Sequence, residues 1–482
     1  MNVKIRTEFT LLAVLVAIAA GLRLYRLDTG LWFDEIATLL DSVRHPLGQI
    51  VTHFPSNNDH PLYSVLARVA ISVFGDEPWA LRLPSALFGV AAIPLLYVLG
   101  RSVTNKIEAA AAAVMLTFSY HHIWFSQNAR GYTLLLVCVL LSTLALIRWL
   151  DSGHRSWLGL YAVSIALGAY AHLTMVLVCV SHAAVCVVDP LLMNSATRVR
   201  HEWKALAGAF VGAGVLTVLL YAPMLGDVGT FFTTSGTAGS AAEVATPVWA
   251  VLAALRGLQV GFGQLWAVAL GGLVFAAGAW SYFRQRAIVA LLFLIPVPAT
   301  LLVMVAMGRP IRPRFVFFAI GFGLLMTVRG AAWIAERFAT TRAGTFTRQR
   351  YATAAVALVT AGVVALSLRS LPYGYRFPKQ DYQEAVRFVE QRRGNDPAAA
   401  IAETSALPVL RYLGRPWERV EAADELEALR TKHGRVWVIY TFGSYIEVDE
   451  PKLWALLQAE CREIQTFEGT VEGGAISVRR CP

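Results

Sequence analysis

ALAGAFVGAGVLTVLLYAPML, residues 205–225, is an apolar run without a single charged side chain. A helix needs about 20 such residues to cross the hydrocarbon core of a bilayer. Comparable runs recur from one end of the chain to residue 370. They predict about eleven transmembrane helices, at 10–27, 82–100, 107–125, 131–150, 156–171, 173–191, 205–225, 264–283, 287–307, 315–335 and 351–370.

The composition of the whole chain agrees with these runs. Of 482 residues, 56% are hydrophobic and only 15% are charged, whereas soluble domains carry about 25% charged residues. A water-soluble fold of this size cannot bury so much apolar surface. The composition therefore excludes a cytosolic enzyme, a disordered protein and a fibrous repeat, and it indicates a mostly α-helical, polytopic membrane protein.

Charge divides the chain into two parts. Residues 1–371 carry 27 Lys and Arg against 15 Asp and Glu, and residues 372–482 carry 15 against 17. The basic excess lies in alternate loops of the apolar part, where it is expected to set topology rather than to bind nucleic acid. We therefore predict a transmembrane domain, 1–371, with a cytoplasmic N-terminus, and an extracytoplasmic domain, 372–482.

The two parts have different internal patterns. In the first long outer loop, apolar residues at helical spacing over 36–43 and 62–73 predict helices too short to span, which suit the outer membrane interface. The tail alternates helical stretches (381–393, 422–432, 450–460) with β-rich runs at 436–440 and 475–478, which predicts a small α/β domain. Cys461 and Cys481 lie in this tail, and they can pair if it is outside the cytoplasm.

The strongest candidate site follows the first predicted span, in Leu31-Trp32-Phe33-Asp34-Glu35. Two adjacent carboxylates among aromatic side chains at a membrane surface are costly unless they are used or paired. A carboxylate that has lost part of its hydration is a better proton acceptor. The alternative is a helix start, with Asp34 as the cap and Glu35 in the first turn.

A second candidate is Asn57-Asn58-Asp59-His60-Pro61-Leu62-Tyr63, which precedes the next predicted interfacial helix. Asp59 can be a helix cap with Pro61 in the first turn. Alternatively, His60 and Tyr63 donate hydrogen bonds to a ligand. A third group, Gln127 with Arg130, lies in a tight outer turn.

Several arginines stand on the outer side, where basic residues are usually sparse. They are Arg130, Arg309, Arg312 and Arg314. A guanidinium can bind two oxygens of one phosphate at once and always keeps its charge. A ligand with a phosphate group therefore explains why these arginines stand on the outer side. The alternatives are anionic lipid headgroups or acidic residues of the tail. His172, at a predicted outer turn, is a site candidate or a helix-packing residue.

These motifs together carry a resemblance. The chain resembles the GT-C superfamily of integral-membrane glycosyltransferases, and within it the protein O-mannosyltransferases and the bacterial lipid A aminoarabinose transferases. The stretches that carry the resemblance are 31–35, Asp59-His60-Pro61-Leu62-Tyr63, Arg82-Leu83-Pro84-Ser85-Ala86-Leu87-Phe88-Gly89, Ser126-Gln127-Asn128-Ala129-Arg130-Gly131-Tyr132 and Pro313-Arg314-Phe315.

The resemblance implies a GT-C fold, a place in a bacterial inner or plasma membrane, and transfer of a sugar from a polyprenyl-phosphate donor to an envelope glycan, lipid or protein acceptor. It implies that Asp34 is the general base. We predict that Glu35 beside it is a second catalytic-site carboxylate, which orients the substrate. Arg309, Arg312 and Arg314 would bind the lipid phosphate. The expected substrate-binding residues are Asp59, His60, Tyr63, Gln127, Arg130 and His172. No separate metal-ligand motif appears, and the scheme requires no metal or cofactor if arginines stabilise the departing phosphate.

Two other classes of protein remain open. A transporter or lipid flippase places polar residues near the membrane midplane on repeated, broken helices, whereas here they gather at one face and no internal repeat is visible. A membrane-anchored binding protein would keep its function in the tail, which has no catalytic motif.

Overall fold

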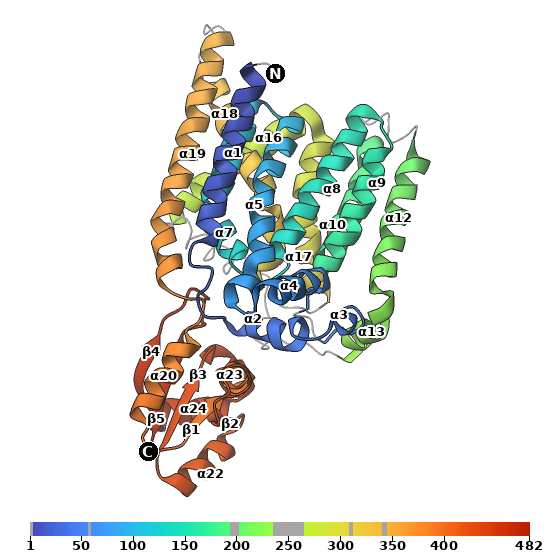
Figure 1. Ribbon diagram of the computed structural model, residues 1–482. Coiled ribbons are helices and arrows are strands. Elements are labelled where there is room, and N and C mark those ends of the chain that lie inside the picture. Colours follow the sequence, from blue (N-terminus) through green and yellow to red (C-terminus); the bar gives the residue numbers. More distant parts are fainter. Residues whose placement is uncertain (1–2, 56–58, 193–201, 235–264, 308–311, 340–344) are drawn as a thin grey trace.

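The computed structural model describes residues 3–55, 59–192, 202–234, 265–307, 312–339 and 345–482. Most of them are helical, and long apolar helices pack side by side into a bundle (Figure 1). The helices of the bundle and of its short connections are α1 (Val3–Leu24), α5 (Pro78–Val103), α6 (Lys106–Phe118), α7 (Tyr120–Ser126), α8 (Tyr132–Ser152), α9 (Ser156–Ala171), α10 (Thr174–Leu192), α12 (Trp203–Tyr221), α13 (Leu225–Thr234), α16 (Leu265–Leu294), α17 (Pro296–Ala306), α18 (Ile320–Phe338) and α19 (Thr345–Arg376).

The expected membrane architecture is confirmed, but not the count of eleven spans. Within the described ranges, six helical stretches are long and apolar enough to cross a membrane. The segments expected at 156–171 and 173–191 form shorter apolar helices, and the one at 107–125 is divided between α6 and α7. A kink at Arg286 inside α16 falls between the segments expected at 264–283 and 287–307. The six stretches are Pro78–Val103, Tyr132–Ser152, Trp203–Thr230, Val268–Ala306, Pro313–Phe338 and Phe346–Arg376.

Short helices lie across one end of the bundle, on the side of the C-terminal domain (Figure 1). They are α2 (Phe33–Thr38), which continues into a π-helical segment (Leu39–Val43), α3 (Leu47–Ile50) and α4 (Pro61–Phe74). Helix α4 forms where the helical spacing predicts, but the stripe that it buries contains Tyr63, Ala67 and Ile71, whereas Val69 and Val73 of the expected apolar face are exposed. These short helices bring the sequence motifs of the first loop to the end of the spans.

The tail folds around a five-stranded mixed sheet of order β2-β1-β3-β5-β4. Strands β1 and β2 and strands β1 and β3 pair in parallel, whereas β5 is antiparallel to both β3 and β4. The central strand VWVIY (β3) is buried on both faces, because helices cover both sides of it. The elements are β1 (Ala398–Ile401), β2 (Glu418–Val420), β3 (Val436–Tyr440), β4 (Arg462–Phe467), β5 (Ile476–Cys481), α20 (Tyr382–Arg392), α21 (Ala402–Ala406), a π-helical segment (Leu407–Tyr412), α22 (Ala423–His433), α23 (Gly443–Asp449) and α24 (Pro451–Glu460).

The C-terminal domain packs onto the first-loop helices. Trp437 and Ile439 of β3 share one buried apolar cluster with Leu31 and Ile36 of the loop. Just before α20, the Gln380 side-chain oxygen accepts the backbone N–H of Phe33 at 3.0 Å. The start of α2 is therefore held between the bundle and the sheet domain.

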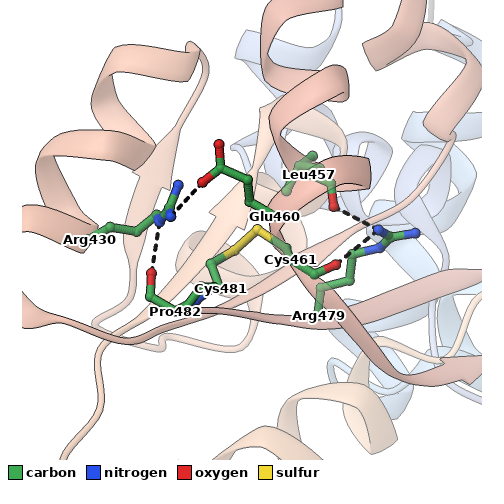
Figure 2. Close-up of a disulfide and its surroundings, with 7 residues drawn as sticks. All are labelled: Arg430, Leu457, Glu460, Cys461, Arg479, Cys481 and Pro482. Carbon is green, nitrogen blue, oxygen red and sulfur yellow. Dashed lines mark hydrogen bonds and ion pairs between the residues drawn. A yellow bond between two sulfur atoms is a disulfide. The ribbon is translucent and has the colours of Figure 1, made fainter.

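A disulfide joins Cys461, after α24, to Cys481 at the end of β5 (Figure 2). Arg479 donates to the carbonyls of Leu457 and Cys461 at 2.7 and 3.2 Å, and Arg430 lies 2.6 Å from the Glu460 carboxylate. The pairing that the sequence allowed for an outside tail is therefore present.

Candidate active site

Helix α2 begins one residue before the two adjacent carboxylates. Trp32 is the N-cap, so Asp34 is inside the helix and is not its cap. The Glu35 carboxylate turns back and accepts the Trp32 backbone N–H at 3.3 Å. Because successive side chains on a helix point about 100° apart, Asp34 and Glu35 face different surroundings.

Glu35 is fully buried in a network of protein donors. Arg82 approaches it with two nitrogens, at 2.8 and 2.5 Å, and the Ala129 N–H donates to it at 2.8 Å. Burial opposes ionisation, but Arg82 and Lys379 outweigh it and hold the pKa of Glu35 below its usual value. Arg82 also donates to the carbonyls of residues 27, 29 and 30. Glu35 therefore ties the first loop to α5.

Asp34 instead meets an arginine from far along the chain. Arg314 Nη1 lies 3.0 Å from Asp34 Oδ2, and the two side chains are 25% and 13% exposed. Arg314 belongs to the 3₁₀ helix Pro313–Ala319 that leads into α18. Its neighbour Arg312 donates to the Tyr445 hydroxyl of α23 at 3.0 Å. Arg309 lies outside the described residues.

Asp59 and His60 stand at the start of α4. His60 is the N-cap and Pro61 is in the first turn, so Asp59 precedes the cap. The Asp59 carboxylate accepts hydrogen bonds from Ser42 (3.0 Å), the His60 N–H (2.9 Å) and Ser64 (3.2 Å). Burial nevertheless raises its pKa to about 6.

Arg130 and His172 complete one cluster with these groups. Arg130 is 3% exposed and donates to Thr38 Oγ1 at 3.4 Å. The His60 and His172 rings are 5.0 Å apart, and each lies 5.5 Å from the ring of Tyr132. Burial, and then the charges of Arg130 and Arg314, lower the pKa of His172 to about 3. The structure thus brings together six predicted site residues: Asp34, Asp59, His60, Arg130, His172 and Arg314.

Two other predicted site residues make hydrogen bonds to backbone carbonyls outside this cluster. The Tyr63 hydroxyl is fully buried and donates to the Leu81 carbonyl at 2.5 Å. The Gln127 amide donates to the carbonyls of Arg23 (3.2 Å) and Tyr25 (2.8 Å). Both side chains therefore fix the backbone around the cluster.

Sequence reasoning gave no role to Arg82, Lys379, Gln380 or Tyr445. Lys379 is 7% exposed, donates to the Gln127 carbonyl at 2.5 Å and lies 3.9 Å from Glu35. Arg82 had a signal, since it is an arginine at the outer end of a predicted span. The other three lie in the tail, and no local pattern links them to the first loop.

Comparison with known proteins agrees with this architecture. A family described as dolichyl-phosphate-mannose-protein mannosyltransferase matches residues 58–221. No curated protein matches the chain in sequence. ArnT from Cupriavidus metallidurans, in the apo state, superposes with a TM-score of 0.57 and 16% identity, over 99% of this chain and 98% of ArnT. The same protein bound to undecaprenyl phosphate gives a TM-score of 0.54, also at 16% identity, over 98% and 97%.

An archaeal relative in fold is the oligosaccharyltransferase AglB from Archaeoglobus fulgidus, in complex with an inhibitory peptide and a dolichol-phosphate. It gives a TM-score of 0.61 at 11% identity, over 95% of this chain and 71% of AglB. At such identities the likeness concerns the fold. The chain is therefore an integral membrane protein with the fold of ArnT and AglB, in agreement with the fold that the resemblance implied.

Proposed function

We propose that the protein transfers a sugar from a polyprenyl-phosphate donor to an acceptor hydroxyl on the extracytoplasmic side of the membrane. The observation that carries this proposal is the pair of Asp34 and Arg314, 3.0 Å apart at the junction of the bundle and the C-terminal domain. ArnT and AglB, which share the fold, have been seen with undecaprenyl phosphate and dolichol-phosphate. A carboxylate can take the proton of an attacking hydroxyl, and a guanidinium beside it can stabilise a departing phosphate.

In the proposed reaction, the acceptor oxygen attacks the anomeric carbon while its proton passes to the Asp34 carboxylate. The bond between that carbon and the phosphate oxygen breaks, and the polyprenyl phosphate leaves with the electron pair. Arg314 and Arg130 stabilise the charge that develops on the leaving phosphate. Within the described residues, the Nε atoms of both arginines are buried without a hydrogen-bond partner, which supports this role.

The other predicted residues then take supporting roles. Glu35 is a positioning residue, because Arg82 and backbone N–H groups surround its carboxylate. Arg312 lies two residues from Arg314 and is assigned, with Arg309, to the lipid phosphate. Asp59, His60 and His172 face the donor sugar, whereas Tyr63 and Gln127 shape the backbone behind them.

The same proposal places residues 1–371 in the membrane as the glycosyltransferase domain and residues 372–482 outside the cytoplasm as a cover over the site. The disulfide between Cys461 and Cys481 supports an outside location, because disulfides persist in oxidising compartments. A bacterial inner or plasma membrane, with the N-terminus in the cytoplasm, fits this topology. The acceptor is then an envelope glycan, lipid or protein.

The test is transfer by membranes that contain the protein, incubated with a panel of labelled polyprenyl-phosphate sugars. Asp34→Asn keeps the size of the side chain but removes the base, so we expect turnover to fall by at least about 100-fold. Asp41→Asn is the matched control, since Asp41 is 37% exposed and its carboxylate is 3.5 Å from Arg411 of the C-terminal domain. Wild-type turnover in Asp34→Asn would remove Asp34 as the base, and no transfer from any donor by the wild type would refute the proposed function.

A further inference from the structure

Hydrogen bonds fix the proton of His60 on one ring nitrogen. His60 Nδ1 lies 2.9 Å from the Ala171 carbonyl, which can only accept, so Nδ1 carries the hydrogen. Burial and the nearby Arg130 hold the pKa of His60 well below its usual value, so the ring is neutral. Nε2 is therefore an acceptor. It is buried and has no hydrogen-bond partner among the described residues.

His172 has the opposite arrangement. The backbone N–H of Thr174 points to His172 Nδ1 at 3.2 Å, and the Thr174 hydroxyl lies 2.8 Å from the same atom. Since a backbone N–H can only donate, Nδ1 is the acceptor and Nε2 carries the hydrogen. The cluster thus contains one imidazole that accepts through Nε2 and one that donates through Nε2.

The backbone holds the two rings close together. A Cβ on Gly131 would lie 2.5 Å from the Ala171 carbonyl and 3.2 Å from His60 Nδ1, so the contact that fixes His60 requires glycine at 131. Arg130 and Arg314 act electrostatically on both rings. The two imidazoles are therefore next to the guanidiniums assigned to the donor phosphate.

A phosphodiester cannot hydrogen-bond to His60 Nε2, because it has no hydrogen to donate and its oxygens repel the lone pair on that nitrogen. Among the groups that every polyprenyl-phosphate sugar carries, only a hydroxyl both donates and accepts. We propose that His60 and His172 form a specificity pair for the donor sugar, in which one sugar hydroxyl donates to His60 Nε2 while His172 Nε2–H donates to that oxygen or its neighbour. This inference rests on the proposed function, and it names the part of the substrate that the two histidines recognise.

The experiment uses the full-length protein and the polyprenyl-phosphate sugar that the wild type turns over best, with its monodeoxy and monodeoxyfluoro analogues. In the wild type, removal of one hydroxyl leaves His60 Nε2 unsatisfied, and we expect kcat/KM to fall between about 10-fold and 100-fold at that position. Fluorine at the same position does not restore the rate, because it has no hydrogen to donate. In His60→Leu, removal of the same hydroxyl should lower kcat/KM by only about threefold or less.

His182→Leu is the matched control. His182 is also fully buried with Nε2 unpartnered in the described part of the chain, but it lies in α10 beside Tyr161, about 12 Å further along the helix axis than Thr174. This variant should keep the wild-type loss of kcat/KM for each analogue. If His60→Leu does not accumulate, His172→Phe keeps an aromatic ring beside Tyr132 and Phe315 and should weaken discrimination at the same hydroxyl.

One result would overturn the specificity pair while leaving the proposed function intact, namely an unchanged profile of kcat/KM penalties in His60→Leu. If that variant also slows the parent sugar and every analogue by the same factor, the pair is assigned to the attacking acceptor hydroxyl instead. A wild type that transfers no sugar at all would instead overturn the proposed function, and this inference with it.

Discussion

Asp34 and Glu35 are adjacent residues of the same charge, but their surroundings differ. Glu35 points into the protein, where Arg82 and backbone N–H groups enclose it. Asp34 points toward Arg314 and remains partly exposed. The sequence suggested that both carboxylates take part in chemistry. The direction of each side chain at the start of α2 separates a candidate base from a structural ion pair.

We predict that Glu35→Gln destabilises the folded protein by about 3–5 kcal/mol, because it leaves the buried Arg82 guanidinium without a counter-charge. The measurement is the thermal unfolding of purified protein in detergent. Glu384→Gln is the control: Glu384 is 50% exposed and its pair with Arg387 lies on the surface of α20, so its loss should cost at most about 1 kcal/mol. Equal effects of the two substitutions would contradict the structural role of Glu35.

At the scale of elements, α16 and α18 pack with their backbones in close approach. A Cβ on Gly278 would lie 1.8 Å from the Met326 carbonyl, and a Cβ on Gly330 would lie 1.8 Å from the Val274 carbonyl. Small residues at such crossings are common between membrane helices. This contact fixes α18, and the 3₁₀ helix that precedes α18 carries Arg314.

We predict that Gly278→Ala forces the two helices apart and destabilises the protein by about 1–3 kcal/mol. Gly271→Ala is the control in the same helix, because nothing lies within 4 Å of a Cβ at that position. That substitution should be neutral or slightly stabilising, since alanine favours helix more than glycine does. Unfolding temperatures measured side by side distinguish the two, and matching values would contradict the close packing.

At the scale of the whole molecule, Lys379 joins the tail to the first loop. Its ammonium group lies 3.9 Å from Glu35 and donates to the Gln127 carbonyl. Burial lowers the pKa of Lys379 from 10.5 to about 7, although Glu35 opposes this shift. Between these two values, the unfolded chain binds a proton that the folded chain has released.

The free energy of unfolding should therefore rise as the pH goes from about 7 to 9, by up to about 1.4 kcal/mol per pH unit. Lys379→Met removes this titration, and its unfolding temperature should be flat over the same range. Parallel curves for the wild type and Lys379→Met would show that another group is responsible. The measurement is thermal unfolding at pH 7, 8 and 9 in one detergent.

The parts of the molecule that the sequence predicted are those with local signals. Apolar runs located the membrane helices, and Asp34, His60, Arg130 and Arg314 were singled out as polar groups at one face of a membrane protein. The contacts of Lys379 with Glu35 and of Tyr445 with Arg312 were not predictable. They join segments far apart in the chain, and neither side carries a pattern that depends on the other. The burial of Glu35 against Arg82 was not predictable either, because it depends on the same long-range packing.

The ion pair of Asp34 and Arg314 has a consequence for competition. An anion that approaches the Nη1 side of Arg314 competes with a carboxylate anchored in the same fold, and such an intramolecular partner acts at an effective concentration of about millimolar or more. A soluble anion must reach a comparable concentration to compete. A phosphate on a long isoprenoid chain is itself confined to the bilayer and therefore concentrated beside the arginine. If Arg314 binds the donor phosphate as proposed, the resting pair therefore favours lipid-borne anions over soluble ones.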